Sequence, residues 1–83
     1  MHDNFMKLEI NEYIVADANI CGGRPVFKET RIMVWQVLEL LGNGVSVDKV
    51  LSDYFPQLSK KAIFSVLNYA SKLIEEEKYV FSE

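Results

Sequence analysis

Residues 46–77 read SVDKVLSDYFPQLSKKAIFSVLNYASKLIEEE and carry the clearest helical pattern of the chain. Ser46 and Ser59 each precede an apolar pattern with helical spacing, and serine is a preferred residue just before the first turn of a helix. The pattern predicts a short helix after Ser46, which Pro56 ends, and a longer helix over about residues 60–77. Two helices joined by so short a connection are typical of a helix-turn-helix or of a plain three-helix bundle.

Apolar residues define the face that each of these two helices is expected to bury. In the short helix they recur at the spacing of one helical face, at Val47, Val50, Leu51 and Tyr54. In the long helix the same spacing predicts a buried stripe along the entire length, formed by Ile63, Val66, Leu67, Ala70, Leu73 and Ile74.

Residues 34–43 predict a further helix, which a pair of glycines is placed to end. Its polar residues all fall on one narrow arc, at Gln36, Glu39 and Asn43. The surface helix of a monomer normally has a wider polar face. We therefore expect this helix to be central in the core or to be shared with a second chain, and we expect the protein to be a homodimer.

The residues before the helical part predict short strands. Apolar and polar residues alternate over residues 7–15, which is typical of a half-buried strand. A pair of glycines then permits positive φ angles, and residues 26–27 follow as a short edge strand. Residues 7–28 are therefore expected to form a short β-hairpin or a pair of short strands.

The fold that follows is mainly α: a three-helix, helix-turn-helix-like bundle preceded by a short β-hairpin or pair of short strands. Its 83 residues make one domain, because a chain of this size does not support two independent cores. Residues 7–28 hold the strands and a glycine–proline loop, residues 34–77 hold the helices, and residues 78–83 form a tail.

The overall composition excludes several classes of protein. Nine basic and twelve acidic residues give a net charge of −3, whereas general polyanion binders are usually basic. The longest nearly apolar run is too short to span a bilayer, and the first residues lack the features of a signal peptide. A single cysteine, Cys21, excludes an internal disulfide and fits a reducing compartment. We therefore expect a cytoplasmic protein that does not enter a membrane.

Charge is distributed unevenly along the chain. Residues 59–72 carry three lysines and no acid, whereas residues 73–83 carry four glutamates and one lysine. Lysines and small polar side chains on one helical face are the mixture with which a recognition helix contacts DNA phosphates and bases. The candidates for DNA contact are Lys60, Lys61, Ser65 and Asn68. An ordinary solvated helix face is the alternative explanation.

Three further groups are candidates for contact with a partner protein. The first is a basic cluster before the first helix, Arg24, Lys28 and Arg31. The second is Phe64, an aromatic residue within the polar arc of the long helix. The third is the pair of aromatic residues in the tail, Tyr79 and Phe81. Guanidinium groups suit a partner's carboxylates, and exposed aromatic side chains suit an apolar surface. The alternatives are that an arginine holds its own loop, that the helical aromatic covers a loop, and that the tail docks back on the domain.

Nothing in the sequence predicts catalysis. The one histidine, His2, has no candidate partner, and a Cys/His cluster with metal-ligand spacing is absent. The paired glycines before Arg24 lack the lysine motif of a phosphate-binding loop. A thiol-dependent enzyme at Cys21 is the weakest alternative, because a small residue filling a turn explains that position. We therefore expect no enzymatic activity, no metal and no cofactor.

Three ordered motifs resemble those of a known family. They are GGRPVFKETRIMV at residues 22–34, LLGNGVS at residues 40–46 and YFPQLS at residues 54–59. The first is similar to the Gly-Lys/Arg-Pro-Val-Ile-Lys-Gly-Thr-Arg-Ile-x-Val signature of the domain of unknown function 433, an antitoxin-like family. Two positions depart from the pattern: Glu29 replaces a glycine, and Phe55 lengthens the approach to the following proline by one residue.

The resemblance implies a function as well as a fold. Members of the family are helix-turn-helix domains preceded by short strands, often encoded beside a PIN-type ribonuclease toxin that they are thought to neutralise. By this resemblance we expect a type II antitoxin that binds a PIN-like ribonuclease and operator DNA. Arg24 or Arg31 would then meet the carboxylates that hold metal in the nuclease. The alternative is a helix-turn-helix-shaped protein-interaction module that does not bind DNA.

Overall fold

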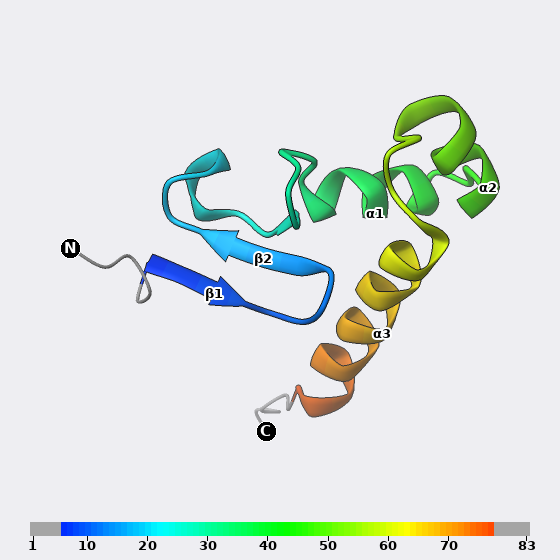
Figure 1. The fold of residues 1–83 in the computed structure, drawn as a ribbon. Helices are drawn as coiled ribbons and strands as arrows, with labels where there is room; N and C mark the ends of the chain where they lie inside the picture. The colour runs from blue at the N-terminus through cyan, green and yellow to red at the C-terminus, as the bar shows by residue number, and fades with distance from the viewer. Residues whose placement is uncertain (1–5, 78–83) are drawn as a thin grey trace, which may run out of the picture.

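The computed structural model describes residues 6–77 and places a small antiparallel sheet before three helices (Figure 1). The strands pair in the order β1–β2–β3 and are β1 (Lys7–Glu9), β2 (Ile14–Asp17) and β3 (Val26–Phe27). The helical elements are a 3-10 turn η2 (Cys21–Gly23), α1 (Val34–Gly42), α2 (Val47–Lys49), a π-helical turn η3 (Val50–Tyr54) and α3 (Lys60–Glu76). Three helices preceded by short strands are thereby confirmed. The predicted tail, with Tyr79 and Phe81, lies outside the described residues.

One predicted strand is two strands in the structure. The alternation over residues 7–15 predicts a continuous strand, which is wrong, because the chain reverses after β1 and β2 pairs antiparallel with it. At this reversal Asn11 Oδ1 accepts hydrogen bonds from the backbone N–H groups of Tyr13, at 2.7 Å, and Ile14, at 3.0 Å. An asparagine side chain that bonds the backbone two and three residues on stabilises a turn at the expense of a strand.

A tight turn carries the chain from β3 back toward α1. Thr30 N–H donates to Phe27 O at 3.1 Å, and Glu29, the third residue of this turn, has φ +63°. Residues other than glycine rarely adopt this left-handed conformation, because their Cβ atom crowds the backbone. Glu29, which stands where the family signature has glycine, therefore adopts a positive φ at a cost in strain that glycine would not have.

Replacing Glu29 by glycine is expected to raise the free energy of unfolding by about 0.5–1 kcal/mol. The substitution removes a left-handed strain of about 1–2 kcal/mol, and the greater freedom of glycine in the unfolded chain offsets part of that gain. Urea denaturation followed by circular dichroism measures the change. Glu29→Ala is the matched control, because it removes the same charge but keeps the Cβ atom. Equal stabilisation by both variants would show that charge, and not backbone strain, is responsible.

Local capping groups fix where the helices begin and end. The serine predictions are confirmed: Ser46 Oγ and Ser59 Oγ each accept the backbone N–H three residues further on, both at 3.1 Å. α1 ends at Gly42, and the chain leaves the helix through Gly44, which has φ +91° and whose N–H donates to Leu41 O at 3.0 Å. Val45 N–H donates to Leu40 O at 3.1 Å, which completes the pair of bonds typical of a glycine-terminated helix.

The short helix after Ser46 widens into the π turn η3. Phe55 N–H donates to Val50 O, five residues back, at 2.8 Å. A π turn takes up one residue more than an α turn, so the additional residue before Pro56 is accommodated here. Tyr54 was predicted on the buried face and is instead 46% exposed. The prediction is wrong because it assumed α-helical spacing up to Tyr54, whereas the π turn η3 places Tyr54 away from the buried face.

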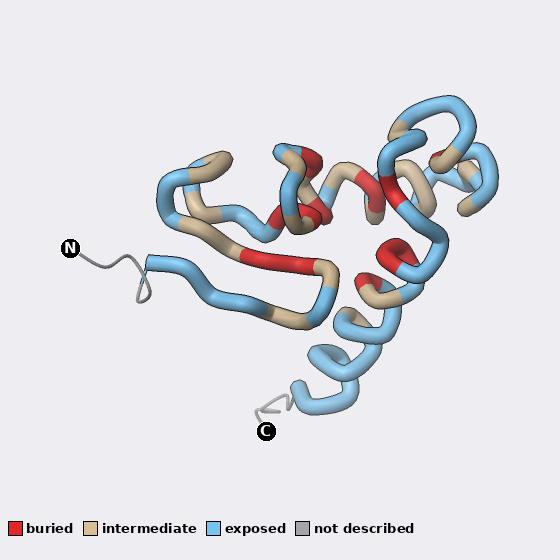
Figure 2. Tube along the Cα trace, in the orientation of Figure 1, coloured by how far each residue is buried: buried red, intermediate tan, exposed pale blue. Residues whose placement is uncertain are grey.

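The core lies between the sheet, α1 and the first half of α3, as the buried segments in Figure 2 show. Its buried members come from β2, β3, α1, η3, α3 and the loops before α1 and α3, and they are Ile14, Phe27, Ile32, Val34, Val37, Val50, Leu58, Ala62, Ile63 and Val66. The predicted strand at residues 26–27 thus contributes one of the largest buried side chains, that of Phe27.

Burial stops halfway along α3, which corrects the predicted continuous stripe. Ile63 and Val66 are buried, but Leu67, Leu73 and Ile74 are exposed. Figures 1 and 2 show why: the last turns of α3 extend past α1 and the core, and they are coloured as exposed. Helical spacing identifies which residues share a face, but how far along that face a core reaches depends on the other elements.

Candidate protein-binding groove

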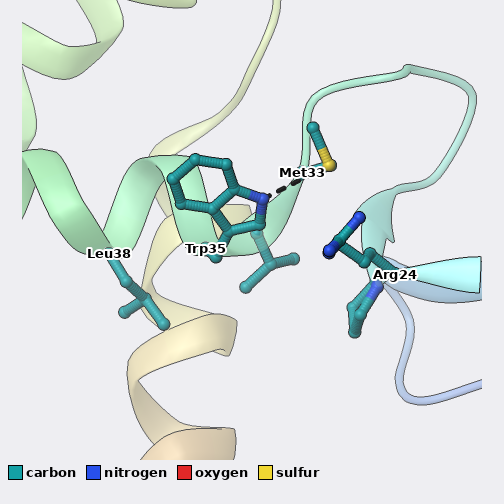
Figure 3. A pocket seen from close by; sticks show the side chains of 6 residues that line it. Arg24, Met33, Trp35 and Leu38 are labelled. Carbon is teal, nitrogen blue, oxygen red and sulfur yellow. Dashed lines mark hydrogen bonds between the residues drawn. The ribbon is translucent and has the colours of Figure 1, made fainter. Parts of the chain in front are cut away.

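An open apolar groove lies where α1 begins. Its volume is about 690 Å³, and its lining comes from the loop after η2, the residue before α1 and the exposed side of α1: Arg24, Pro25, Met33, Val34, Trp35 and Leu38. Trp35 and Arg24 stand on opposite sides of the groove, and Leu38 lies one turn further along α1 (Figure 3). Most of the lining is therefore apolar, with one guanidinium group at the edge.

Backbone pairing brings the two sides of the groove together. Val34 N–H donates to Pro25 O at 2.9 Å, and Met33 forms a bridge with Val26 of β3. The first turn of α1 is fixed by Gln36, whose Oε1 accepts the Met33 N–H at 3.1 Å. The loop that carries Arg24 is thus held beside the helix that carries Trp35, although eleven positions separate them.

Trp35 is the most prominent side chain of this surface. It is 47% exposed, and its indole Nε1–H points to Met33 Sδ at 3.3 Å, the contact drawn in Figure 3. This contact occupies the only polar atom of the ring and leaves the rest of the indole as apolar surface. The sequence predicted α1 to be wholly apolar apart from one narrow arc, and it did not single out Trp35 as a contact residue.

The chemistry of the groove suits a protein partner. Tryptophan and arginine are the residue types that most often dominate the binding energy of protein interfaces. A small polar metabolite would find few hydrogen-bonding groups here, because Arg24 is the only charged residue of the lining. Residues 6–77 contain no group of three or more His, Cys, Asp or Glu side chains that could hold a metal ion.

The structure separates the predicted basic cluster. Arg24 belongs to the groove, whereas Lys28 Nζ pairs with Glu9 Oε1 of β1 at 3.2 Å. Arg31 is exposed and lines a different hollow, together with residues such as Val15 of β2. Of the three basic candidates, only Arg24 lies beside an exposed aromatic side chain.

The four candidates for DNA contact are all on α3 but in different surroundings. Lys60 Nζ pairs with Asp48 Oδ1 at 3.1 Å, and Lys61 is exposed. Ser65 Oγ donates to Ala62 O at 2.7 Å, within its own helix. Ser65 and Asn68 line a hollow together with the turn between β1 and β2, which includes Glu12. Lys60 and Lys61, in the first turn of α3, therefore lie away from the loop that joins β1 and β2.

Phe64 is exposed, as its place in the polar arc predicts. Helical spacing identifies Trp35 as exposed in the same way. Trp35 shares a side of α1 with Glu39 and Gly42, four and seven positions on. The buried Val34 and Val37 lie on the other side.

Fold and groove together define a small, mainly helical domain with an open apolar groove on its surface. Residues 14–70, from β2 into α3, match the family model described as Protein of unknown function (DUF433), and the chain belongs to this family. The matched region includes every residue that lines the groove. The comparisons with curated proteins and with solved structures return no significant match. Within residues 6–77, no helix has both the length and the apolar character needed to cross a membrane.

Proposed function

We propose that this chain is an antitoxin that binds and neutralises a PIN-like ribonuclease, with the groove at Trp35 as its contact surface. The observation that carries the proposal is a half-exposed tryptophan opposite an arginine at an apolar groove. The resemblance of the family signature to antitoxin-like domains supplies the class of partner. The groove supplies a surface of the kind that protein partners use.

The two sides of the groove have complementary tasks in such a complex. An aliphatic or aromatic side chain of the nuclease packs on the exposed indole and on Leu38, which removes apolar surface from water. Arg24 reaches from the opposite side with five N–H donors, a geometry that matches a carboxylate. A nuclease that holds metal with clustered carboxylates offers that group, and its engagement by Arg24 competes with the metal.

Inhibition of a neighbouring nuclease tests the proposal. The purified chain is titrated into the small ribonuclease encoded next to it, and cleavage of a labelled RNA is followed. We expect cleavage to stop near one equivalent of antitoxin chain per nuclease. Undiminished cleavage at a large molar excess, or a neighbouring gene that encodes no nuclease, would refute the antitoxin function. Binding of the neighbouring protein without inhibition would support the interaction module instead.

Operator binding through α3 is a second candidate, as part of a helix-turn-helix-like arrangement of α2 and α3. The observation that favours it is charge: Lys60, Lys61 and Lys72 are exposed, and no acidic residue occurs on α3 before Glu75. Lysines on one helix neutralise DNA phosphates and position the helix on the duplex. The rival module without DNA binding is favoured by the net charge of −3 and by the Lys60–Asp48 pair.

Salt-dependent titration of duplex DNA separates these two candidates. We expect the chain to bind its own upstream DNA, and the Lys60→Ala, Lys61→Ala double variant to lower the slope of log affinity against log salt by about 2. A double variant of the sheet region, Lys7→Ala with Arg31→Ala, loses the same charge and should leave the slope unchanged. Equal effects of both double variants would indicate non-specific attraction, and no binding at low salt would exclude the DNA-binding function.

A further inference from the structure

α3 carries an exposed seam, which we define as Phe64, Leu67, Ser71 and Ile74. These residues follow one another at intervals of three, four and three positions, which places them on one side of a helix. All four are exposed, and Ile74 is exposed over 67% of its surface. The later turns of α3, on which the seam ends, are drawn as exposed in Figure 2.

The seam is distinct from the face that α3 turns to its own core. The core face uses Ala62, Ile63 and Val66, whereas Phe64 and Leu67 lie beside it. Spacing of three and four residues with apolar side chains is the pattern by which one helix packs along another. Ser71 is small and Ala70 is adjacent to the seam, so that a second helix can approach closely at its centre.

The charges beside the seam indicate what packs on it. Lys61 lies beside the seam near its beginning, and Glu75 lies on the same side near its end. Both are exposed, and neither has an ion pair within residues 6–77. The two residues are fourteen positions apart, about 21 Å along a helix, and so do not pair within one chain. A second α3 running antiparallel brings Lys61 of one chain to Glu75 of the other, twice by symmetry.

A parallel pair of helices lacks this complementarity. It would place Glu75 and Glu76 of both chains at the same end, where like charges repel, and would leave the lysines at the other end. An antiparallel pair instead packs Phe64 on Ile74 of the second chain and Leu67 near the small Ser71 of the second chain. A two-fold axis then passes near the middle of the seam, as a self-complementary homodimer requires.

We propose that the seam is a homodimer interface in which α3 packs antiparallel on α3 of a second copy of this chain. This places the interface on α3, and not on α1 as the apolar character of that helix predicts. It also leaves the groove at Trp35 open in each copy, since that groove is lined by the loop after η2 and by α1. The proposal does not depend on the identity of the groove's partner.

Sedimentation equilibrium of the full chain gives the first test. We expect a mass near twice the 9.6 kDa of one chain at micromolar concentration. Leu67→Lys and Ile74→Lys should each raise the dissociation constant of the dimer at least about 30-fold, as loss of a central interface residue does. Tyr69→Lys is the matched control: Tyr69 is exposed to a similar degree as Leu67, on the opposite side of α3, and its replacement should leave the mass unchanged.

Charge reversal tests the direction of the helices. Lys61→Glu and Glu75→Lys should each weaken the dimer, and the double variant should restore most of the affinity, because the pair re-forms between chains with its signs exchanged. Circular dichroism of each variant shows whether the chain remains folded.

Three results would overturn the proposal. A monomer at every accessible concentration would show that the seam does not bind a second copy. In that case, a loss of stability on truncation after Glu77 would indicate that residues 78–83 of the same chain pack on the seam. A dimer that tolerates both Leu67→Lys and Ile74→Lys would use another surface. Absence of rescue in the double charge-reversal variant would exclude the antiparallel arrangement. Trp35→Ala should leave the mass unchanged, so failure of this proposal is separable from failure of the proposed function.

Discussion

Replacing Phe27 by alanine is expected to lower the free energy of unfolding by about 3–5 kcal/mol. Phe27 is only 2% exposed and is among the largest fully buried side chains of the described chain. Its removal leaves a cavity between β3 and the helices, and a strand of two residues has little backbone pairing with which to compensate. A domain of this length has a total stability of about 4–12 kcal/mol, so a substantial fraction of the variant should be unfolded.

Urea denaturation at a fixed protein concentration measures the loss. Leu8→Ala is the matched control, because Leu8 is a large apolar residue of the same sheet that is mostly exposed. Its replacement should change the stability by no more than about 0.5 kcal/mol. A loss below about 1 kcal/mol in Phe27→Ala would contradict the position of Phe27 in the core.

Replacing Trp35 by alanine is expected to weaken nuclease binding at least about 30-fold, or about 2 kcal/mol, and to abolish neutralisation at equimolar concentrations. The indole is half exposed in the isolated chain, and in the proposed complex the partner buries it fully. For the same reason the free energy of unfolding should change little. Isothermal titration calorimetry against the nuclease, and urea denaturation of the variant alone, measure the two effects.

Tyr54→Ala is the control for Trp35→Ala. Tyr54 is an aromatic residue with the same degree of exposure, 46% against 47%, but it ends η3 and does not line the groove. Its replacement should leave nuclease binding within about twofold. If both variants weaken binding equally, general loss of exposed aromatic surface explains the result and the groove is not the contact site. Arg24→Lys adds a further test, because lysine keeps the charge but loses the planar pair of donors.

The helix boundaries were predictable because they depend on groups close together in the chain. Ser46 and Ser59 each accept a backbone N–H three residues on, and Gly44 supplies the positive φ that ends α1. The break at Asn11 is also local, but the alternating pattern around it predicted a strand. The asparagine turn signal and the alternation compete, and hydrogen bonding of the side chain to two backbone N–H groups decided between them.

The groove was less predictable, because its two sides come from different segments. The sequence identifies Arg24 by its charge but does not identify Trp35. The two residues share a groove only because the backbone hydrogen bond between Pro25 and Val34 brings their segments together. Lys28 shows the opposite case: it was grouped with the arginines by sequence distance, and a salt bridge to β1 separates it from them.

The family signature, the succession of a strand region and three helices, the capped ends of the helices and the separation of basic from acidic residues along α3 can all be read from the sequence. Which of the apolar residues are buried depends on tertiary packing. Leu67 and Ile74 share the helical spacing of Ile63 and Val66, yet only the latter two are buried. Caps and spacing act over a few residues of one chain segment, whereas burial requires a second segment at the same place, and the core reaches only the first half of α3.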